Sequence, residues 1–434
     1  MRVATSTIAA LALAVTPATA VAAPGALDPS FSGDGWTRTL EVRSASNNYL
    51  PEAALDVAIA PGGGIVTAGE LQDGRSEWYF GAFRFLAGGD LDGGFGEGGW
   101  VDNDIGSFEM PRAVAVQPDG RIVVAGSSDC ADTTCFTLAR YLPGGALDRT
   151  FGAGGIAQTT FPQRGAEAFD VAVARDGKIV AAGFTRRGSD GQDSVVFAVA
   201  RFLPDGRLDP SFSRDGHAIV DFGYGNDQAR AVAVTPSGKI VVAGSAGRER
   251  HATLDDFAIA RFRVDGRLDR SFAGDGRRTM HFGKRRGDGA YGVALPGRGR
   301  IVVVGSSAAE DYHRPPQMAL VRLRSDGSLD RAFGRRRTLP GPYGGYASAV
   351  LVRGGRVVVG GRAFADGGRD SSDWALAGYT SRGAPDRAFG AGGIAVTDFG
   401  TGSDEITALA AQGDKVVAAG SIYASLGLAR YATR

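Results

Sequence analysis

Short strand-like segments alternate with tight turns along the whole chain. One kind is short and alternating, as at residues 112–116 (Arg-Ala-Val-Ala-Val). A second kind is rich in β-branched residues and ends in Gly, as at 122–126 and 240–244. A Pro-Asp-Gly turn at 118–120 joins two such segments, which predicts a β-hairpin. Because no segment shows sustained helical periodicity, the sequence predicts an all-β fold.

A third kind of segment is apolar on both faces. In residues 257–262, Phe257 and Ile259 fall on one face of a strand, and Ala258 and Phe262 fall on the other. A fourth segment follows a Gly placed four residues after a repeated Phe in six of seven copies. A four-stranded sheet that is apolar on both faces must be sandwiched between neighbours. Sheets stacked radially satisfy this requirement, so the pattern predicts a β-propeller with four antiparallel strands per blade.

The phrase Leu-Asp-x-x-Phe marks each repeat. Successive Phe positions lie 56 to 64 residues apart, and this period indicates repeated structural units. The seventh copy is the weakest, with Pro385 in place of Leu. The copies carry the pairs Asp28 and Phe31, Asp92 and Phe95, Asp148 and Phe151, Asp209 and Phe212, Asp269 and Phe272, Asp330 and Phe333, and Asp386 and Phe389.

The two ends of the chain complement each other. Residues 428–432 form a third strand with no fourth, whereas residues 25–36 supply a turn and a fourth strand with nothing before them. Joined, they make one complete unit, and a free sheet edge is removed. We therefore expect residues 24–434 to form one seven-bladed β-propeller, with the N-terminal strand completing the last blade.

An Arg on the third strand precedes the repeated Asp by eight residues in five units. We interpret these residues as structural clamps, in which the Asp accepts two N–H bonds from the Arg across a turn. A ring of charged binding sites is the alternative. In the sixth unit Gly378 replaces the Arg, although Asp386 remains. The predicted pairs are Arg84–Asp92, Arg140–Asp148, Arg201–Asp209, Arg261–Asp269, Arg322–Asp330 and, through ring closure, Arg430–Asp28.

The repeats resemble those of the bacterial delta-60 repeat family, which are exported β-propellers of unknown function. The shared pattern is A-V-A-V-x-P-D-G-K-I-V-V-A-G-S, followed by F-A-x-A-R-F-x-P-D-G-x-L-D-x-x-F-G, and it covers essentially all of residues 24–434. The resemblance implies the propeller fold and export, and it implies neither a ligand nor a reaction. The departures are Gly378, Pro385 and Arg337, all in the fifth and sixth units.

The N-terminus and the charge balance bear on location and partners. Residues 1–22 combine Arg2, an apolar run at 8–15 and small residues around Ala20 and Ala22, which predicts a cleaved secretory signal peptide. The apolar run is too short to span a membrane. With 48 basic and 47 acidic residues, the net charge of +1 argues against nucleic acid or an anionic membrane as partner. We expect a soluble, secreted monomer, which could be held at the cell envelope.

Cysteine and histidine offer little for metal or catalytic chemistry. Cys130 and Cys135 share one loop, and in an exported protein this predicts a Cys130–Cys135 disulfide. Because other ligands are scarce nearby, we predict no metal site and no cofactor; calcium in the Asp/Gly turns stays open. His313 near Asp311, or His251 near Asp255, could form an acid/base pair. No hydrolase, phosphate-loop or zinc-protease motif is found in the sequence.

The repeats differ most on the predicted face of the propeller that carries the connections between second and third strands. Connections from the second to the third strand run from 6 to 14 residues there, and a rigid scaffold with variable loops is typical of binding proteins. Residues beside the first-strand entrances surround the predicted channel mouth. The candidate ligand-binding residues are Arg112, Asp227, Arg230, Asp404 and Glu405.

We therefore predict a binding scaffold whose partner is an extracellular glycan, a peptide or an envelope component. The alternative is a propeller-type glycan hydrolase or lyase with carboxylates at the channel mouth. Passive association with the cell wall is a third interpretation.

Overall fold

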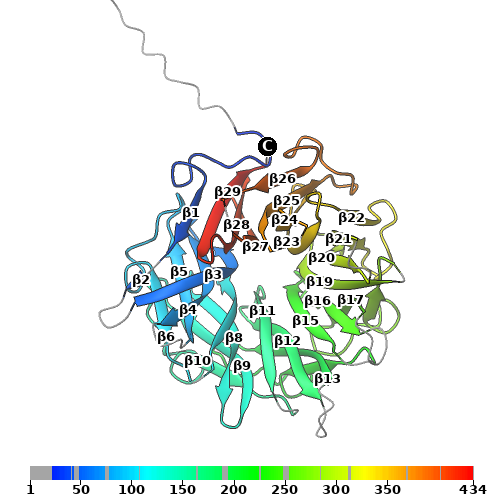
Figure 1. Ribbon diagram of the computed structural model, residues 1–434. Helices are drawn as coiled ribbons and strands as arrows, with labels where there is room; N and C mark the ends of the chain where they lie inside the picture. Colours follow the sequence, from blue (N-terminus) through cyan, green and yellow to red (C-terminus); the bar gives the residue numbers. More distant parts are fainter. Residues whose placement is uncertain are drawn as a thin grey trace, which may run out of the picture.

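The computed structural model is a seven-bladed β-propeller (Figure 1). It describes residues 22–433, apart from residues 41, 44–47, 74–77, 107, 163–164, 188–193, 224–225, 248–253, 284, 311–313, 368–369 and 401. The predicted signal peptide therefore lies almost wholly outside the described residues. In the described part of the chain, no helix has the length and apolar character needed to cross a membrane.

Each blade is an antiparallel sheet whose first strand lies nearest the axis of the ring (Figure 1). Blade 1 carries a short additional strand, β2, which pairs with the start of β3. Blade 1 comprises β2 (Val42–Arg43), β3 (Asn48–Ile59), β4 (Ile65–Asp73), β5 (Trp78–Phe85) and β6 (Trp100–Asn103). Blade 2 comprises β7 (Met110–Val116), β8 (Ile122–Cys130), β9 (Thr133–Tyr141) and β10 (Ile156–Thr159). Blade 3 comprises β11 (Ala166–Val173), β12 (Ile179–Arg187), β13 (Ser194–Phe202) and β14 (His217–Val220).

The remaining blades repeat this order, including the fifth and sixth units in which the sequence departs from the repeat. Blade 4 comprises β15 (Gln228–Val234), β16 (Ile240–Gly247), β17 (Asp255–Phe262) and β18 (Arg277–Met280). Blade 5 comprises β19 (Arg286–Ala294), β20 (Ile301–Ala309), β21 (Gln317–Leu323) and β22 (Arg335–Thr338). Blade 6 comprises β23 (Gly345–Arg353), β24 (Arg356–Phe364), β25 (Ser372–Tyr379) and β26 (Ile394–Thr397). Blade 7 comprises β27 (Glu405–Gln412), β28 (Lys415–Ser421), β29 (Leu426–Ala432) and β1 (Trp36–Thr39).

The predicted closure of the ring is confirmed. Strand β1 pairs with β29 in antiparallel register, with Trp36 opposite Ala429, and completes the sheet of blade 7. The N–H of Arg430 donates to the carbonyl oxygen of Gly35 at 2.9 Å. The ring is therefore closed by hydrogen bonds between the two end strands, and β29 is paired on both sides.

The core lies between the blades. On β17, Phe257 and Ile259 pack in one apolar cluster with residues of blade 5, whereas Ala258 and Phe262 pack in another with residues of blade 3. All four side chains are at most 1% exposed. Burying an aromatic or branched side chain contributes roughly 1.5–3 kcal/mol. The third strand is thus sandwiched, as its two apolar faces predict.

The repeated Arg–Asp pairs link neighbouring blades as well as the turns within one blade. All six predicted pairs are present, with Arg Nε to Asp Oδ2 distances of 2.7–2.9 Å, but each Asp accepts one N–H from its Arg and not the two expected. In blade 4, Arg261 also donates through Nη1 to the carbonyl oxygen of Ser325 in blade 5. Its guanidinium lies over the ring of Phe272, 4.9 Å from the centroid. We call this arrangement the interblade staple; its other acceptors are the carbonyl oxygens of Pro143, Pro204, Val264, Ser381 and Ala87.

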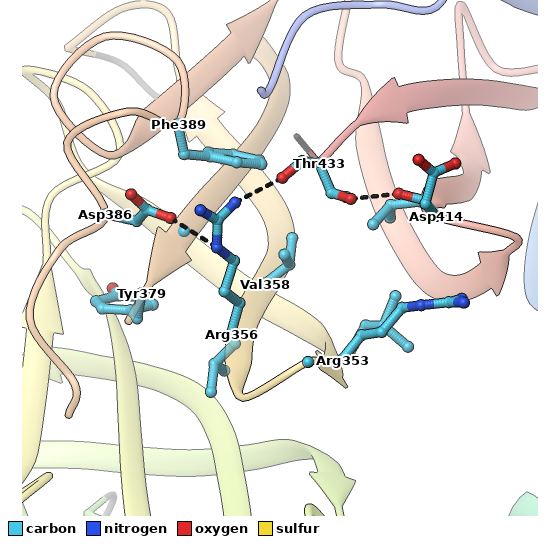
Figure 2. A pocket seen from close by; sticks show the side chains of 13 residues that line it. Arg353, Arg356, Val358, Tyr379, Asp386, Phe389, Asp414 and Thr433 are labelled. Atoms are coloured by element: carbon cyan, nitrogen blue, oxygen red, sulfur yellow. Dashed lines mark hydrogen bonds and ion pairs between the residues drawn. The ribbon is translucent and has the colours of Figure 1, made fainter. Parts of the chain in front are cut away.

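Blade 6 makes its staple from a different strand. Gly378 stands where the other blades carry Arg, and Arg356 of β24 extends to the same place (Figure 2). Its Nε lies 3.4 Å from Asp386 Oδ2, and its Nη1 donates to the carbonyl oxygen of Thr433 at 2.6 Å. Thr433 follows the third strand of blade 7 at the position that Ser325 occupies in blade 5. The ring therefore has seven staples, of which one is built from a second-strand residue.

Each first strand contains a β-bulge at the same position. In blade 4 the register shifts between Ala229 and Ala231, so Arg230 has no partner on β16. The bulge brings the carbonyl oxygen of Gln228 against Gly244, where a Cβ would lie only 1.9 Å from that oxygen. The equivalent distance is 1.8–2.0 Å in blades 2 to 7. In blades 2 to 7 the Gly that ends the second-strand motif is thus required by the bulge opposite it.

Replacing Gly244 with Ala is therefore expected to lower the free energy of unfolding by about 3 kcal/mol, because backbone must move to admit the methyl group. Gly144 is the matched control, since nothing lies within 4 Å of its Cβ position. Gly144→Ala should change the free energy of unfolding by no more than about 0.5 kcal/mol. Urea denaturation of both variants measures the difference. Equal midpoints would contradict the role assigned to the bulge.

Candidate functional site

The bulges build the wall of the central channel. A cavity of about 180 Å³ lies there, lined by residues of the first strands of all seven blades. Each bulged residue lines this cavity, and no two neighbouring blades carry the same one. The seven bulged residues are Leu55, Arg112, Phe169, Arg230, Tyr291, Ser348 and Thr407.

Two guanidinium groups and one aromatic ring form the most distinctive part of the channel. The Cζ atom of Arg230 lies 4.1 Å from the ring centroid of Phe169, and that of Arg112 lies 5.9 Å from it. Burial lowers the pKa of Arg230, and the nearby charge of Arg112 lowers it further, although Tyr291 and Glu167 oppose the shift. Within the described residues, Nε of Arg230 is buried without a hydrogen-bond partner. We call Arg112, Phe169 and Arg230 the arginine pair site.

Asp56 and Asp170 lie in the same cavity, and sequence reasoning missed both. Each follows a bulged residue and accepts one backbone N–H from its own strand and one from the next blade. Burial raises the pKa of both carboxyl groups, and the charge of Asp56 raises the pKa of Asp170 further. The donors are Val57 and Val114 to Asp56 at 2.8 Å, and Val171 and Val232 to Asp170 at 2.7 and 2.6 Å.

A signal for these two residues was present in the repeat. At the position after the bulge, the other five blades carry only small residues, namely Ala113, Ala231, Gly292, Ala349 and Ala408. An Asp at a position otherwise held by Ala or Gly is a departure of the kind that marks function.

The raised pKa of Asp170 predicts a pH dependence of stability. Its folded pKa lies above the usual Asp value of about 3.9, so its contribution is fully present below that pH and is lost as the pH rises through the folded pKa. Asp170→Asn should flatten this decline. Urea unfolding between pH 4 and 8 measures how steeply the free energy of unfolding falls with pH. This slope is compared, and not the free energy at one pH, because the Asn variant also loses one hydrogen-bond acceptor. An unchanged slope would contradict an ionisable Asp170 in the channel.

Glu405 lies at the rim of the channel. Its Oε2 is 2.9 Å from Nη1 of Arg362, and its Oε1 accepts from the hydroxyl of the bulged Ser348 at 3.1 Å. The guanidinium of Arg362 lies over the ring of Tyr346, 5.2 Å from the centroid. Of the five predicted ligand-binding residues, the structure thus places Arg112 and Arg230 in the channel wall and Glu405 beside it.

The other two predicted ligand-binding residues are buried loop caps. Asp227 and Asp404 are 0% exposed, and neither lines the channel cavity. Asp227 Oδ2 accepts the N–H of Phe222 at 2.7 Å, and Asp404 Oδ1 accepts the N–H of Tyr423 at 2.8 Å. Burial raises the pKa of Asp227 to about 7 and that of Asp404 above its usual value. Their nearness to the first strand in sequence suggested a rim position, but their side chains turn between the blades.

Histidine and metal chemistry find little support in the channel. His251 and His313, the predicted acid/base candidates, lie outside the described residues. His217 is packed 4.7 Å from the ring of Phe161, and burial lowers its pKa. Within the described part of the chain, no group of three or more potential metal ligands converges, so we assign no residues to calcium. The Cys130–Cys135 disulfide is present and links the last residue of β8 to the third residue of β9.

The fold and its repeated units define the chain as a β-propeller repeat protein. Four segments match a family model described as "Domain of unknown function (DUF5122) beta-propeller", and together they cover about a third of the chain. The matched residues are 117–151, 174–212, 235–272 and 299–333. Each segment runs from the first hairpin turn of a blade to the Phe of Leu-Asp-x-x-Phe, so the family model describes the scaffold. No curated protein matches the chain in sequence.

Solved structures with similar folds include the polysaccharide lyase Uly1, with a TM-score of 0.51 and 10% identity over 88% of this chain and 90% of that one. Sqt1 from Chaetomium thermophilum has a TM-score of 0.41 and 14% identity over 88% of this chain and 97% of that one. A glucose dehydrogenase has a TM-score of 0.38 and 13% identity over 75% and 97% of the two chains. Identities this low concern the fold alone.

Proposed function

We propose that this protein is an exported binding scaffold that holds an anionic extracellular ligand at the mouth of its channel. The arginine pair site carries the proposal. Two guanidinium groups share one aromatic ring there, and the charge of Arg112 lowers the pKa of Arg230. An arrangement of like charges is stabilised by an anion between them, and Arg suits carboxylate, sulfate and phosphate because its planar fork matches their oxygens.

Among extracellular ligands, an acidic glycan fits the site best. Tyr291, which is 41% exposed, lines the same cavity as Phe169, so two aromatic side chains are available to contact the apolar face of a sugar ring. The pKa of Asp170, raised to about 8 by burial and by the charge of Asp56, favours a neutral carboxyl group at Asp170, which would not repel an anion. A peptide or an envelope component that carries an acidic group would use the same contacts.

Export and family membership complete the proposal. The signal sequence predicted in residues 1–22 would deliver the mature chain outside the cytoplasm, where such glycans occur. The propeller family match is compatible with the finer assignment to delta-60 repeats, which rests on the sequence pattern. We propose a monomer, because ring closure within one chain leaves no blade to be completed by a partner.

Screening the purified protein against paired acidic and neutral oligosaccharides tests the proposal. We expect binding to acidic members, weakening as the salt concentration rises, because partly exposed charges are screened. Neutral members of the same size and linkage serve as the control. Equal binding to both sets, or binding to neither set and to no envelope fraction, would overturn the proposal.

A glycan hydrolase or lyase is the second candidate, and one observation favours it. Asp56 and Asp170 share the channel cavity, and the charge of one raises the pKa of the other, as in carboxylate pairs that divide acid and base roles. An enzyme would shorten a bound acidic glycan over hours, and Asp170→Asn would stop this while leaving binding intact. Incubation with recovery of the intact glycan would favour the scaffold.

A further inference from the structure

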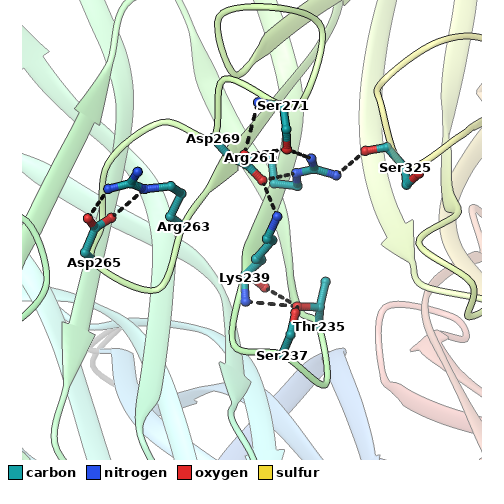
Figure 3. Close-up of polar contacts among 9 residues, drawn as sticks. All are labelled: Thr235, Ser237, Lys239, Arg261, Arg263, Asp265, Asp269, Ser271 and Ser325. Atoms are coloured by element: carbon teal, nitrogen blue, oxygen red, sulfur yellow. Dashed lines mark hydrogen bonds and ion pairs between the residues drawn. The ribbon is translucent and has the colours of Figure 1, made fainter.

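The groove between blades 6 and 7 exposes the carboxylate of its Arg–Asp pair, whereas the grooves between blades 3 and 4 and between blades 4 and 5 do not. Each groove lies beside the first hairpin turns of two neighbouring blades, on the side of the propeller away from the bulges. In the grooves between blades 3 and 4 and between blades 4 and 5, the staple residues Arg201 and Arg261 line the cavity. Their Asp partners do not line it, because the guanidinium groups cover them. Figure 3 shows this arrangement around Arg261.

In the groove between blades 6 and 7, the Asp of the Arg–Asp pair, Asp386, lines the cavity itself. Gly378 supplies no side chain, and the ring of Phe389 packs over it so closely that a Cβ would lie 2.7 Å from Phe389 Cγ. Asp386 and Phe389 therefore line a cavity of about 230 Å³ together with Arg356 (Figure 2). We call this cavity the 6–7 groove; its apolar lining residues include Leu351, Val358 and Val416.

Asp386 also has fewer cations than its counterparts in blades 2, 3, 4 and 7. In blade 4, Asp269 Oδ2 is 2.8 Å from both Arg261 Nε and Lys239 Nζ, so two cations share one carboxylate (Figure 3). Blades 2, 3 and 7 repeat this with a second-strand cation, namely Arg121, Lys178 and Lys415. In blade 6 the second-strand cation, Arg356, has taken the place of the missing third-strand Arg. Within the described residues, Asp386 forms an ion pair with Arg356 alone, at 3.4 Å between Asp386 Oδ2 and Arg356 Nε.

We propose that the 6–7 groove binds a guanidinium or ammonium group carried on a short aliphatic stem. The charged head would occupy the second cation position at Asp386, and the stem would lie against Val358, Val416 and the ring of Phe389. Blades 2, 3, 4 and 7 fill the equivalent position with a cationic side chain of their own second strand. The site is independent of the channel and goes beyond the proposed function, since it lies on the opposite side of the propeller.

The same head group can come from an Arg or Lys side chain of a partner polypeptide or from a free amine. The shared test uses butylguanidinium as probe and butylurea as its neutral isostere, with binding followed by calorimetry. We expect millimolar binding of butylguanidinium and none of butylurea, because the head group must carry charge. Tighter binding of acetyl-Gly-Arg-Gly-amide than of spermidine supports a polypeptide source, and the reverse order supports a free amine.

Three variants assign the binding to this groove. Asp386→Asn should weaken butylguanidinium binding at least tenfold, because a charged partner is lost while an acceptor for the N–H of Ala388 remains. Arg356→Ala should strengthen it about threefold or more, because the competing cation is removed. Asp326→Asn, in the groove between blades 4 and 5, is the control and should leave it unchanged.

Two results would overturn the proposal. One is butylurea binding as well as butylguanidinium. The other is butylguanidinium affinity that is the same in the wild type, Asp386→Asn and Arg356→Ala. Because Asp386→Asn and Arg356→Ala are expected to change affinity in opposite directions, a general loss of folding cannot imitate the predicted pattern. Loss of channel binding to glycans, with butylguanidinium binding intact, would leave this inference standing.

Discussion

Replacing Arg261 with Ala is expected to lower the free energy of unfolding by about 3–5 kcal/mol. The substitution removes one of the two cations that share the 4%-exposed Asp269, together with the link to Ser325 in blade 5. Burial works to raise the pKa of Asp269, but hydrogen bonds from Lys239 and Ser271, with the charge of Arg261, hold it below its usual value. Chemical denaturation monitored by fluorescence measures the loss.

Arg263 provides the matched control for this prediction. It pairs with Asp265 two residues away, and both side chains are exposed on the same turn (Figure 3). Arg263→Ala should change the free energy of unfolding by less than about 0.5 kcal/mol. If both alanine variants unfold at the wild-type midpoint, the staple does not hold neighbouring blades together.

The architecture could be predicted from the sequence because its causes are local and repeated seven times. Alternation, turn residues and the two apolar faces of 257–262 each recur at a fixed place in the unit, so one misjudged copy is corrected by the others. Ring closure followed from the complementary ends. The pairing of Arg430 with Asp28, 402 residues apart, needed no contact information beyond the repeat.

The site was only partly predictable, because side-chain direction there depends on the bulge. A bulge adds one residue to a strand, so simple alternation misassigns which residues face the channel. Arg112 and Arg230 were identified from their place at the strand entrance, whereas Asp56 was passed over as a strand residue. Asp227 was assigned to the rim, although its carboxylate caps a buried loop.

Removing both charges of the arginine pair site is the second large effect that we predict. In the Arg112→Gln/Arg230→Gln double variant, the side chains keep much of their length and polarity but can no longer form charge-assisted bonds to an anion. Each such bond contributes roughly 1.5–3 kcal/mol, so affinity for an acidic glycan should fall about 100-fold or more. Stability should change little, because neither guanidinium takes part in a staple.

The dissociation constant of that double variant for an acidic oligosaccharide, compared with the wild type, tests the central claim most directly. The single variants Arg112→Gln and Arg230→Gln each lose one positive charge. Arg263→Gln loses one positive charge on the opposite side of the propeller and is the charge-matched control for them. We predict at least about 100-fold weaker binding by the double variant and wild-type binding by the control. A double variant that is folded and binds the acidic oligosaccharide as tightly as the wild type would contradict a ligand site at the channel mouth.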